Sequence, residues 1–335
     1  FFLSLFLISN LIFFNILDLK DSKFAYKDLL LKFNFYSKYN DDLYKKYKDT
    51  NEATQFLIKG SISGKNCHNH KIEDNFLQNC LFKKSSNNKN FLLLGGSQTS
   101  VLSYDLKNKL RDFNYFHLTS SNFIYINNFD KINIKNNKKN LDFFERNLFI
   151  KRLISSLDQD SIVLIGARYP VYLNNSFFDN LEGGKESNIW RSKLEHIKDP
   201  TIKWEDGFRN SINEMLKNKN IKIIFIYPIP AVGFNISKRL RGNYFFPFDK
   251  LDTSYKVYKD RVKTSFELLD SIQNDNIYRV YPHKLFCDTI KKNRCVAFNN
   301  NKIFYSDDDH LSKYGSQMLS RLIIEEVEKI RLKSN

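Results

Sequence analysis

The chain has 335 residues, and its 53 Lys and Arg against 37 Asp and Glu give a formal net charge of +16. Apolar residues make up 42% and charged residues 27%, which excludes a wholly disordered chain and one buried throughout in a membrane. The excess of lysine raises the hypothesis of a nucleic-acid binder, but no zinc-finger, RNA-recognition or basic-helix motif accompanies it. We interpret the charge as a solvated surface and expect no nucleic-acid partner.

Residues 1–17 form an apolar run without a charge. The run is slightly shorter than the ~20 residues that span a bilayer, and it lacks the basic start and the cleavage site of a signal peptide. We interpret it as the end of a transmembrane helix whose earlier part is missing; a buried helix of the following domain is the alternative. Residues 18–90 are polar and rich in Tyr and Lys, and we predict a linker or accessory extension there.

Residues 91–332 alternate short apolar runs with amphipathic segments, and we predict one domain over this range. The runs of strand length are 91–94, 115–118, 162–165, 221–227 and 277–281. The segments with helical periodicity are 101–111, 141–157, 204–217, 255–272 and 314–332. This alternation predicts an α/β fold, a three-layer α/β/α sandwich with a parallel five-stranded sheet, whose functional site lies in the loops after the strands.

The four cysteines fall into two close pairs, Cys67 with Cys80 and Cys287 with Cys295. Each pair could close a short loop through a disulfide, a bond that persists in oxidising compartments. The alternative is a metal site, suggested by the run Cys-His-Asn-His at residues 67–70. Zinc sites favour separated ligand pairs at characteristic spacing, and no second pair stands nearby, so we expect no metal.

Two segments carry residues suited to nucleophilic catalysis. Ser97 follows the first strand in a turn with two glycines, which presents its hydroxyl at the edge of the sheet; an N-cap or a phosphate-binding turn is the alternative. A serine hydroxyl needs a base, and the base needs a group that fixes its tautomer. Asp307 and His310, just before the last helix, could supply both, although a cation site or a solvated acidic turn also fits three consecutive carboxylates.

The order of these two segments on an α/β chain resembles the SGNH (GDSL-like) hydrolase superfamily, whose fold is flavodoxin-like. The resemblance is closest to the SGNH domain fused to acyltransferase-3 membrane proteins, where the base segment reads Tyr-x-Asp-Asp-Asp-His-Leu-Ser, as residues 305–312 do. Residues 162–169, which end in Ala-Arg-Tyr, and residues 227–235, which begin Tyr-Pro-Ile-Pro, resemble two strand ends of that group. Cysteine pairs ahead of both catalytic segments and a preceding hydrophobic helix are similar too.

The resemblance implies that Ser97 is the nucleophile and that His310, oriented by Asp307, is the base. This chain departs from the family pattern Gly-Asp-Ser-His, because it has Gly-Gly-Ser-Gln at residues 95–98. The departure removes a carboxylate and an imidazole beside the nucleophile, which bears on substrate orientation, rate and activity itself.

The oxyanion and substrate contacts are less clearly marked in the sequence. The backbone N–H of Ser97 is one candidate oxyanion donor, because of its position in the turn, and Asn122 in the loop after the second strand is another. Arg168, at the end of the third strand, is a candidate to bind the acceptor or an acyl oxygen through its fork of donors; a structural salt bridge is the alternative.

These similarities imply the extracytoplasmic portion of an O-acyltransferase of the inner membrane, which forms an acyl-serine and passes the acyl group, most simply acetyl, to an envelope glycan such as lipopolysaccharide O-antigen or peptidoglycan. The donor would be acetyl-CoA, handled by the missing acyltransferase-3 domain, and no cofactor would be bound here. Two alternatives remain: a carbohydrate or lipid esterase with the same triad, and a catalytically silent glycan-binding domain, motivated by Gly96 and Gln98.

Overall fold

The structure is a computed structural model, and it describes residues 67–68, 72, 76, 80–82, 89–157, 160–174, 178–185, 192–234, 236, 251–300 and 302–334. The predicted end of a transmembrane helix at 1–17 and most of the predicted extension at 18–90 lie outside these residues. Within the described ranges, no helix combines the length and the apolar character needed to cross a bilayer.

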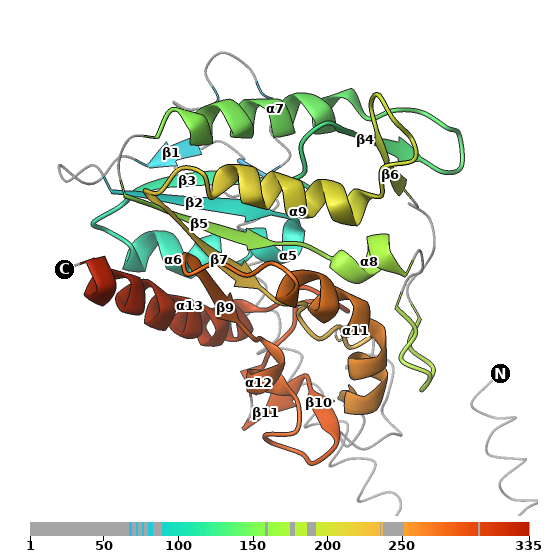
Figure 1. The fold of residues 1–335 in the computed structure, drawn as a ribbon. Coiled ribbons are helices and arrows are strands. Elements are labelled where there is room, and N and C mark those ends of the chain that lie inside the picture. Colours follow the sequence, from blue (N-terminus) through green and yellow to red (C-terminus); the bar gives the residue numbers. More distant parts are fainter. Residues whose placement is uncertain are drawn as a thin grey trace, which may run out of the picture.

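A central sheet of six strands organises this part of the chain (Figure 1). Its order is β1-β3-β2-β5-β7-β9, with the strands at Leu81–Phe82, Asn114–Thr119, Asn90–Gly95, Ser161–Gly166, Ile221–Ile226 and Ile277–Val280. All neighbouring pairs from β3 to β9 are parallel. The predicted α/β fold and its five parallel strands are therefore confirmed, and β1 adds an antiparallel edge beside β3.

Burial explains why these strands read as continuous apolar runs. Every residue of β2, β3 and β5 is buried. A parallel sheet in an α/β protein is covered on both faces, so its strands show no alternation of apolar and polar residues. The three leucines of β2, at 92–94, have no solvent exposure. The centre of the core therefore lies along β2 and its neighbours.

Helices cover both faces of this sheet. Figure 1 shows α7 (Leu141–Ser155) and α9 (Trp204–Met215) over one face and α6 (Ser103–Lys109) and α13 (Lys313–Ser334) over the other. A further long helix, α11 (Tyr255–Asp270), packs against the short α8 (Tyr169–Leu173), which follows β5. The five predicted helices are confirmed to within two residues at each end. The first of them is preceded by α5 (Ser97–Ser100), a separate turn that holds the candidate nucleophile.

Smaller elements complete the described part. Three antiparallel ribbons pair β4 (Phe129–Asn133) with β6 (Ser192–His196), β8 (Asp252–Ser254) with β10 (Arg294–Val296), and β11 (Phe298–Asn299) with β12 (Lys302–Ile303). The short helix α12 (His283–Phe286) follows β9. None of the ribbons joins the main sheet.

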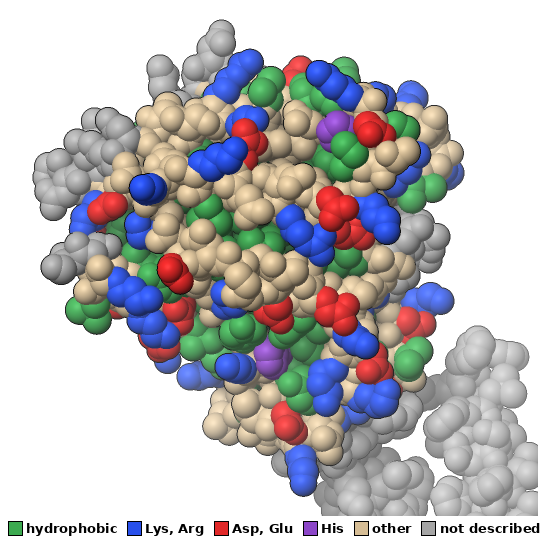
Figure 2. All heavy atoms as spheres, in the orientation of Figure 1, with side chains coloured by type: hydrophobic (Ala, Val, Ile, Leu, Met, Phe, Trp, Pro, Cys, Tyr) green, Lys and Arg blue, Asp and Glu red, His purple; other side chains and the backbone are tan. Residues whose placement is uncertain are grey.

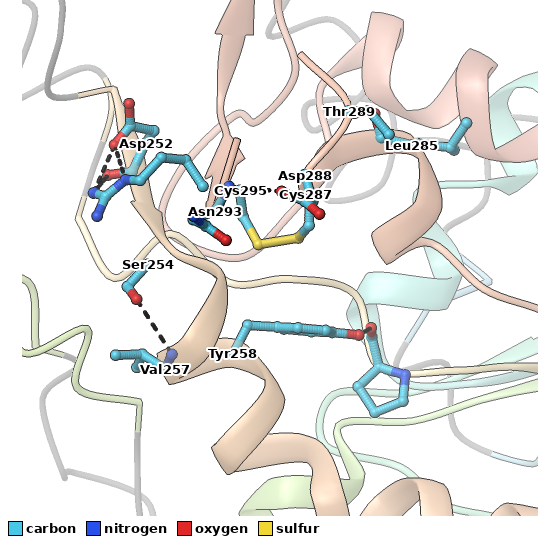
Figure 3. The surroundings of a disulfide bond; sticks show 12 residues. Asp252, Ser254, Val257, Tyr258, Leu285, Cys287, Asp288, Thr289, Asn293 and Cys295 are labelled. Atoms are coloured by element: carbon cyan, nitrogen blue, oxygen red, sulfur yellow. Dashed lines mark hydrogen bonds and ion pairs between the residues drawn. A yellow bond between two sulfur atoms is a disulfide. The ribbon is translucent and has the colours of Figure 1, made fainter. Parts of the chain in front are cut away.

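Both predicted disulfides are present, Cys67–Cys80 and Cys287–Cys295, and the described residues include no free cysteine. They close loops with sequence separations of 13 and 8, and loops of this size stabilise a fold by roughly 2–3 kcal/mol each. Figure 3 shows Tyr258 of α11 beside the second bond. The Tyr258 hydroxyl donates to the carbonyl of Pro228 at 2.8 Å, which ties this region to the loop after β7.

The surface charge is dispersed on the face drawn in Figure 2, where Lys and Arg side chains lie among Asp and Glu rather than in one patch. Many of the described cations form local ion pairs, such as Lys256 with Asp260 and Lys193 with Glu195. Such dispersed, paired charges are typical of a solvated surface.

Candidate active site

Ser97, His310 and Asp307 lie together at the carboxyl ends of the parallel strands. Ser97 opens α5 directly after β2, and His310 and Asp307 come from the turn before α13. His310 Nε2 lies 2.8 Å from Ser97 Oγ, and His310 Nδ1 lies 2.8 Å from Asp307 Oδ2. These contacts give the arrangement that a Ser-His-Asp triad requires: a hydroxyl, a base beside it, and a carboxylate that orients the base.

Of the two glycines before Ser97, only Gly95 is needed for the turn that positions the serine. Gly95 has φ of +151°, and a Cβ there would lie 2.0 Å from the carbonyl oxygen of Gly166, its partner in the adjacent strand β5. Only glycine permits so close an approach. Gly96 differs, because its φ of −80° suits any residue and the nearest atom to a Cβ would be 3.7 Å away. The first glycine is therefore needed for the turn and the second is not.

The base segment is fixed by its own backbone. Asp307 Oδ1 accepts hydrogen bonds from the backbone N–H groups of Asp309 at 3.0 Å and His310 at 2.7 Å. Its other oxygen, Oδ2, contacts the imidazole. An Asp side chain that accepts hydrogen bonds from backbone N–H groups two and three residues later closes a tight turn of the backbone. The spacing Asp-x-x-His therefore brings His310 back onto Asp307.

A second carboxylate contacts the same imidazole nitrogen. Asp309 Oδ1 lies 2.9 Å from His310 Nδ1, and the Asp309 side chain is almost fully buried. Its Oδ2 is 3.2 Å from Arg168 Nε and accepts a hydrogen bond from Gln98 Nε2 at 3.2 Å. Sequence analysis assigned no role to Asp309, because the Asp-x-x-His spacing pairs only Asp307 with His310. The Arg168 contact is the salt bridge that we considered as the alternative to substrate binding.

The two carboxylates dominate the electrostatics of the base. Burial acts to lower the pKa of His310, but the charges of Asp309 and Asp307 outweigh burial and raise the pKa well above its usual value. Burial likewise acts to raise the pKa of Asp309, while His310 and Arg168 lower it overall. Because both carboxylates accept from Nδ1, that nitrogen carries a proton, and Nε2 faces the Ser97 hydroxyl.

The cation site considered as an alternative would use two of the three consecutive carboxylates, together with His310. Ligand atoms of Asp307, Asp309 and His310 lie within 4.8 Å of one another. However, the point that the two carboxylates share is the His310 Nδ1 proton, and Arg168 already supplies positive charge to Asp309. The arrangement therefore fits an oriented base better than a set of metal ligands.

Asn122 lies in the loop after β3, which borders the nucleophile turn. A Cβ at Gly96 would be 3.7 Å from the carbonyl oxygen and 3.8 Å from the nitrogen of Phe123. Asn122 has a left-handed backbone, with φ of +47°, and its carbonyl accepts hydrogen bonds from Lys131 Nζ at 2.8 Å and from the Tyr172 hydroxyl at 2.5 Å. The loop is thus close enough to the nucleophile turn to contribute donors to a bound substrate.

His68 also reaches this loop, from the segment before β1. Its Nδ1 contacts Thr119 Oγ1 at 3.0 Å and its Nε2 contacts Ser121 Oγ at 3.2 Å. Burial, with smaller effects of the positive charges of His310 and Arg146, lowers the pKa of His68 to about 4, so the ring is neutral. Cys67 is in a disulfide and both His68 nitrogens contact hydroxyls, so these two residues are not arranged as zinc ligands; residues 69 and 70 lie outside the described residues.

Comparison with known proteins identifies the family and supports the fold. The family model for SGNH domains fused to AT3 domains matches residues 66–325. The fold is similar to the periplasmic domain of a lipopolysaccharide acetyltransferase from Salmonella ser. Paratyphi A, with 18% identity, a TM-score of 0.53, and coverage of 85% of this chain and 97% of that chain. No curated protein sequence gives a match.

Two further structures share less of the fold. A proposed acylhydrolase from Bacteroides fragilis has 15% identity and a TM-score of 0.37 over 74% of this chain and 91% of its own. A possible lipase from Chitinophaga pinensis has 14% identity and a TM-score of 0.34 over 73% of this chain and 99% of its own. The family assignment does not rest on either of these two structures. It rests on the family model, which matches far more than half of the residues. The chain belongs to the family of SGNH domains that are fused to AT3 domains.

Proposed function

We propose that this chain is the extracytoplasmic, acyl-transferring part of a membrane-bound O-acyltransferase. The observation that carries the proposal is the pair of contacts from His310, to Ser97 Oγ at 2.8 Å and to Asp307 Oδ2 at 2.8 Å, on an SGNH domain of the family fused to AT3 domains. A hydroxyl, base and oriented carboxylate in line are what formation of an acyl-serine needs.

The first half of the reaction forms the acyl-enzyme. His310 Nε2 takes the proton from Ser97 Oγ, and the oxygen bonds to the acyl carbonyl carbon of the donor. The carbonyl electrons move to oxygen and give a tetrahedral oxyanion. When they return, the bond to the donor's leaving group breaks, and that group takes the proton held by His310.

The second half passes the acyl group to the acceptor. A sugar hydroxyl replaces the leaving group, gives its proton to His310 Nε2, and bonds to the acyl carbon. The bond to Ser97 Oγ then breaks, and the proton returns to that oxygen. The product is an O-acylated glycan and the enzyme is restored.

A relative of the domain and its two disulfides support the substrates and the compartment that we propose. A solved relative is the periplasmic domain of a lipopolysaccharide acetyltransferase, which favours acetyl as the group transferred and an envelope glycan, such as O-antigen, as acceptor. Acetyl-CoA would serve as donor substrate through an AT3 domain in the inner membrane. Two disulfides are typical of a domain that works outside the cytoplasm.

An esterase with the same residues is the second candidate, and one observation favours it. The His310 side chain is 23% exposed, so water can reach the imidazole. Transfer and hydrolysis differ in which hydroxyl attacks the acyl-serine, and exclusion of water decides between them.

An acceptor-partition experiment tests the proposal. The full chain in detergent is supplied with an aryl acetate and increasing concentrations of an O-antigen or peptidoglycan oligosaccharide, with Ser97→Ala as the matched control. A transferase yields acetylated oligosaccharide at the expense of free acetate, and the Ser97→Ala variant yields neither. Free acetate alone at every concentration would favour the esterase, and equal behaviour of both proteins would overturn the role of Ser97.

A further inference from the structure

A lysine is buried beside the loop after β3. Lys131 lies in β4, is 9% exposed, and has no carboxylate within ion-pair distance among the described residues. Its Nζ donates to the carbonyl oxygen of Asn122 at 2.8 Å and lies 3.5 Å from that of Ser121, with the ring of Phe143 at 6.0 Å. Burial lowers the pKa of Lys131 to about 8. A buried ammonium without a counter-charge is unfavourable for folding. We therefore looked for a role of Lys131 in the hydrogen bonds that it donates to the loop after β3.

Lys131 shares its acceptor with a second donor. The Tyr172 hydroxyl, from α8, contacts the same Asn122 carbonyl at 2.5 Å. Two donors from separate elements fix the plane of the peptide between Asn122 and Phe123. None of the described peptide bonds is cis, so the N–H of this peptide points away from its C=O, and therefore away from Lys131 and Tyr172.

That N–H belongs to Phe123, whose nitrogen would lie 3.8 Å from a Cβ at Gly96, the residue before the nucleophile. Neither the Phe123 N–H nor the Ser97 N–H has an acceptor among the described residues. Backbone N–H groups inside a fold are almost always paired. Two unpaired donors on adjoining segments next to a nucleophilic serine are what a developing oxyanion requires.

We propose that Lys131 is a positioning residue for the acyl-transfer reaction: it fixes the Asn122–Phe123 peptide and polarises it, so that the Phe123 N–H stabilises the oxyanion formed at Ser97. This inference rests on the proposed function. A positive charge on the carbonyl side of a peptide draws electron density toward the oxygen and makes the N–H a stronger donor. Tyr172 assists from α8. Lys131 itself touches no reacting atom.

The test compares Lys131→Met with Lys139→Met in the full chain, by steady-state hydrolysis of an aryl acetate. Methionine keeps most of the length of the lysine side chain and removes its charge and its donors. Lys139 is a matched control, because it is in the same part of the chain, its side chain is exposed, and its Nζ pairs with the Asp130 carboxylate at 2.6 Å rather than with the loop after β3. We expect kcat to fall about 10-fold in Lys131→Met with KM within about 2-fold, and both constants to be unchanged in Lys139→Met.

A second variant keeps the test decisive if Lys131→Met does not fold. Tyr172→Phe removes only the other donor to the same carbonyl and should lower kcat by several-fold without changing KM. Lys131→Arg, which restores charge and donors, should recover part of the loss. If wild type turns over through Ser97 while Lys131→Met and Tyr172→Phe both match it in kcat, the inference is overturned. If wild type shows no Ser97-dependent turnover, the proposed function itself fails.

Discussion

The side-chain amide of Gln98 binds Asp309 twice, through Nε2 contacts of 3.1 Å to its backbone carbonyl and 3.2 Å to its carboxylate. The two residues are 211 positions apart in the sequence, and the contact joins the nucleophile turn to the base segment. Gln98 stands where the family pattern has histidine. Its role here is to hold, with a neutral donor, the carboxylate that faces His310. The glutamine that departs from the family pattern thus forms hydrogen bonds within the site.

Removing this amide should weaken both the fold and the reaction. In Gln98→Ala, a buried carboxylate loses a donor, which costs about 1–3 kcal/mol in the free energy of unfolding. We expect kcat for aryl acetate hydrolysis to fall about 10-fold, since Asp309 and His310 are less firmly placed. Gln98→Glu should be worse, because it puts a carboxylate against Asp309. Full activity in both variants would contradict the role given to Gln98.

The second carboxylate predicts a shift in pH dependence. His310 acts as base only when Nε2 is unprotonated, so kcat/KM rises with pH through the pKa of His310. Asp309 helps to raise that pKa, and Asp309→Asn should therefore move the rise to lower pH. Asp307→Asn should instead lower kcat/KM roughly 10³-fold or more at every pH, because His310 loses the carboxylate that orients its imidazole. A pH profile that Asp309→Asn leaves in place would contradict this account.

Substitution of the two glycines before Ser97 should affect stability to very different extents. Gly96→Asp, which restores the family residue, places its Cβ in ordinary van der Waals contact with the Phe123 backbone at an ordinary φ, and at this N-cap position it should change the free energy of unfolding by only a few tenths of a kcal/mol. Gly95→Ala would place Cβ 2.0 Å from the Gly166 oxygen and should cost about 3 kcal/mol or more. Urea unfolding measures both. Equal stability of the two variants would show that the turn is not as described.

Two buried histidines predict acid sensitivity. Burial is the main cause that lowers the pKa of His68 to about 4 and that of His117 to about 3, from an ordinary value of 6.5. Both are neutral in the fold, while the unfolded chain binds protons below pH 6.5. The free energy of unfolding should thus fall as pH drops from about 6.5 through 4, by up to about 3 kcal/mol for His68.

His68→Gln tests this directly, because glutamine retains hydrogen-bonding groups and does not titrate. The variant should lose less stability than wild type between pH 6.5 and 4. Parallel pH dependences for the two proteins, measured by urea unfolding, would assign the acid sensitivity to other groups.

The main sheet could be predicted from sequence because its strands are buried on both faces and read as apolar runs. The ribbon of β4 and β6 could not. The polar sequence of β6, SKLEH, is only half-buried, and its partner β4 lies about sixty residues earlier in the chain. The edge strand β1, at Leu81–Phe82, is too short to form a pattern. Such elements are set by tertiary contacts rather than by local preference.

The site divides in the same way. Ser97, Asp307 and His310 were found because a motif marks them, and the structure brings them together. Asp309 and Lys131 were not, because their importance lies in burial. Asp309 looks like its neighbours until the turn shows which carboxylates contact the imidazole. Lys131 is one of 53 cationic residues, and nothing in the sequence separates it from a surface lysine.

The most direct test of the account is the covalent intermediate. The full chain is mixed with an aryl acetate, quenched in acid within the first turnover, digested, and analysed by mass spectrometry, with Ser97→Ala and His310→Ala treated in parallel. We predict an acetyl group on Ser97 in wild type and none on the corresponding peptide of either variant. Acetylation that is absent from wild type, or that is found equally in Ser97→Ala, would contradict an acyl-serine mechanism at this site.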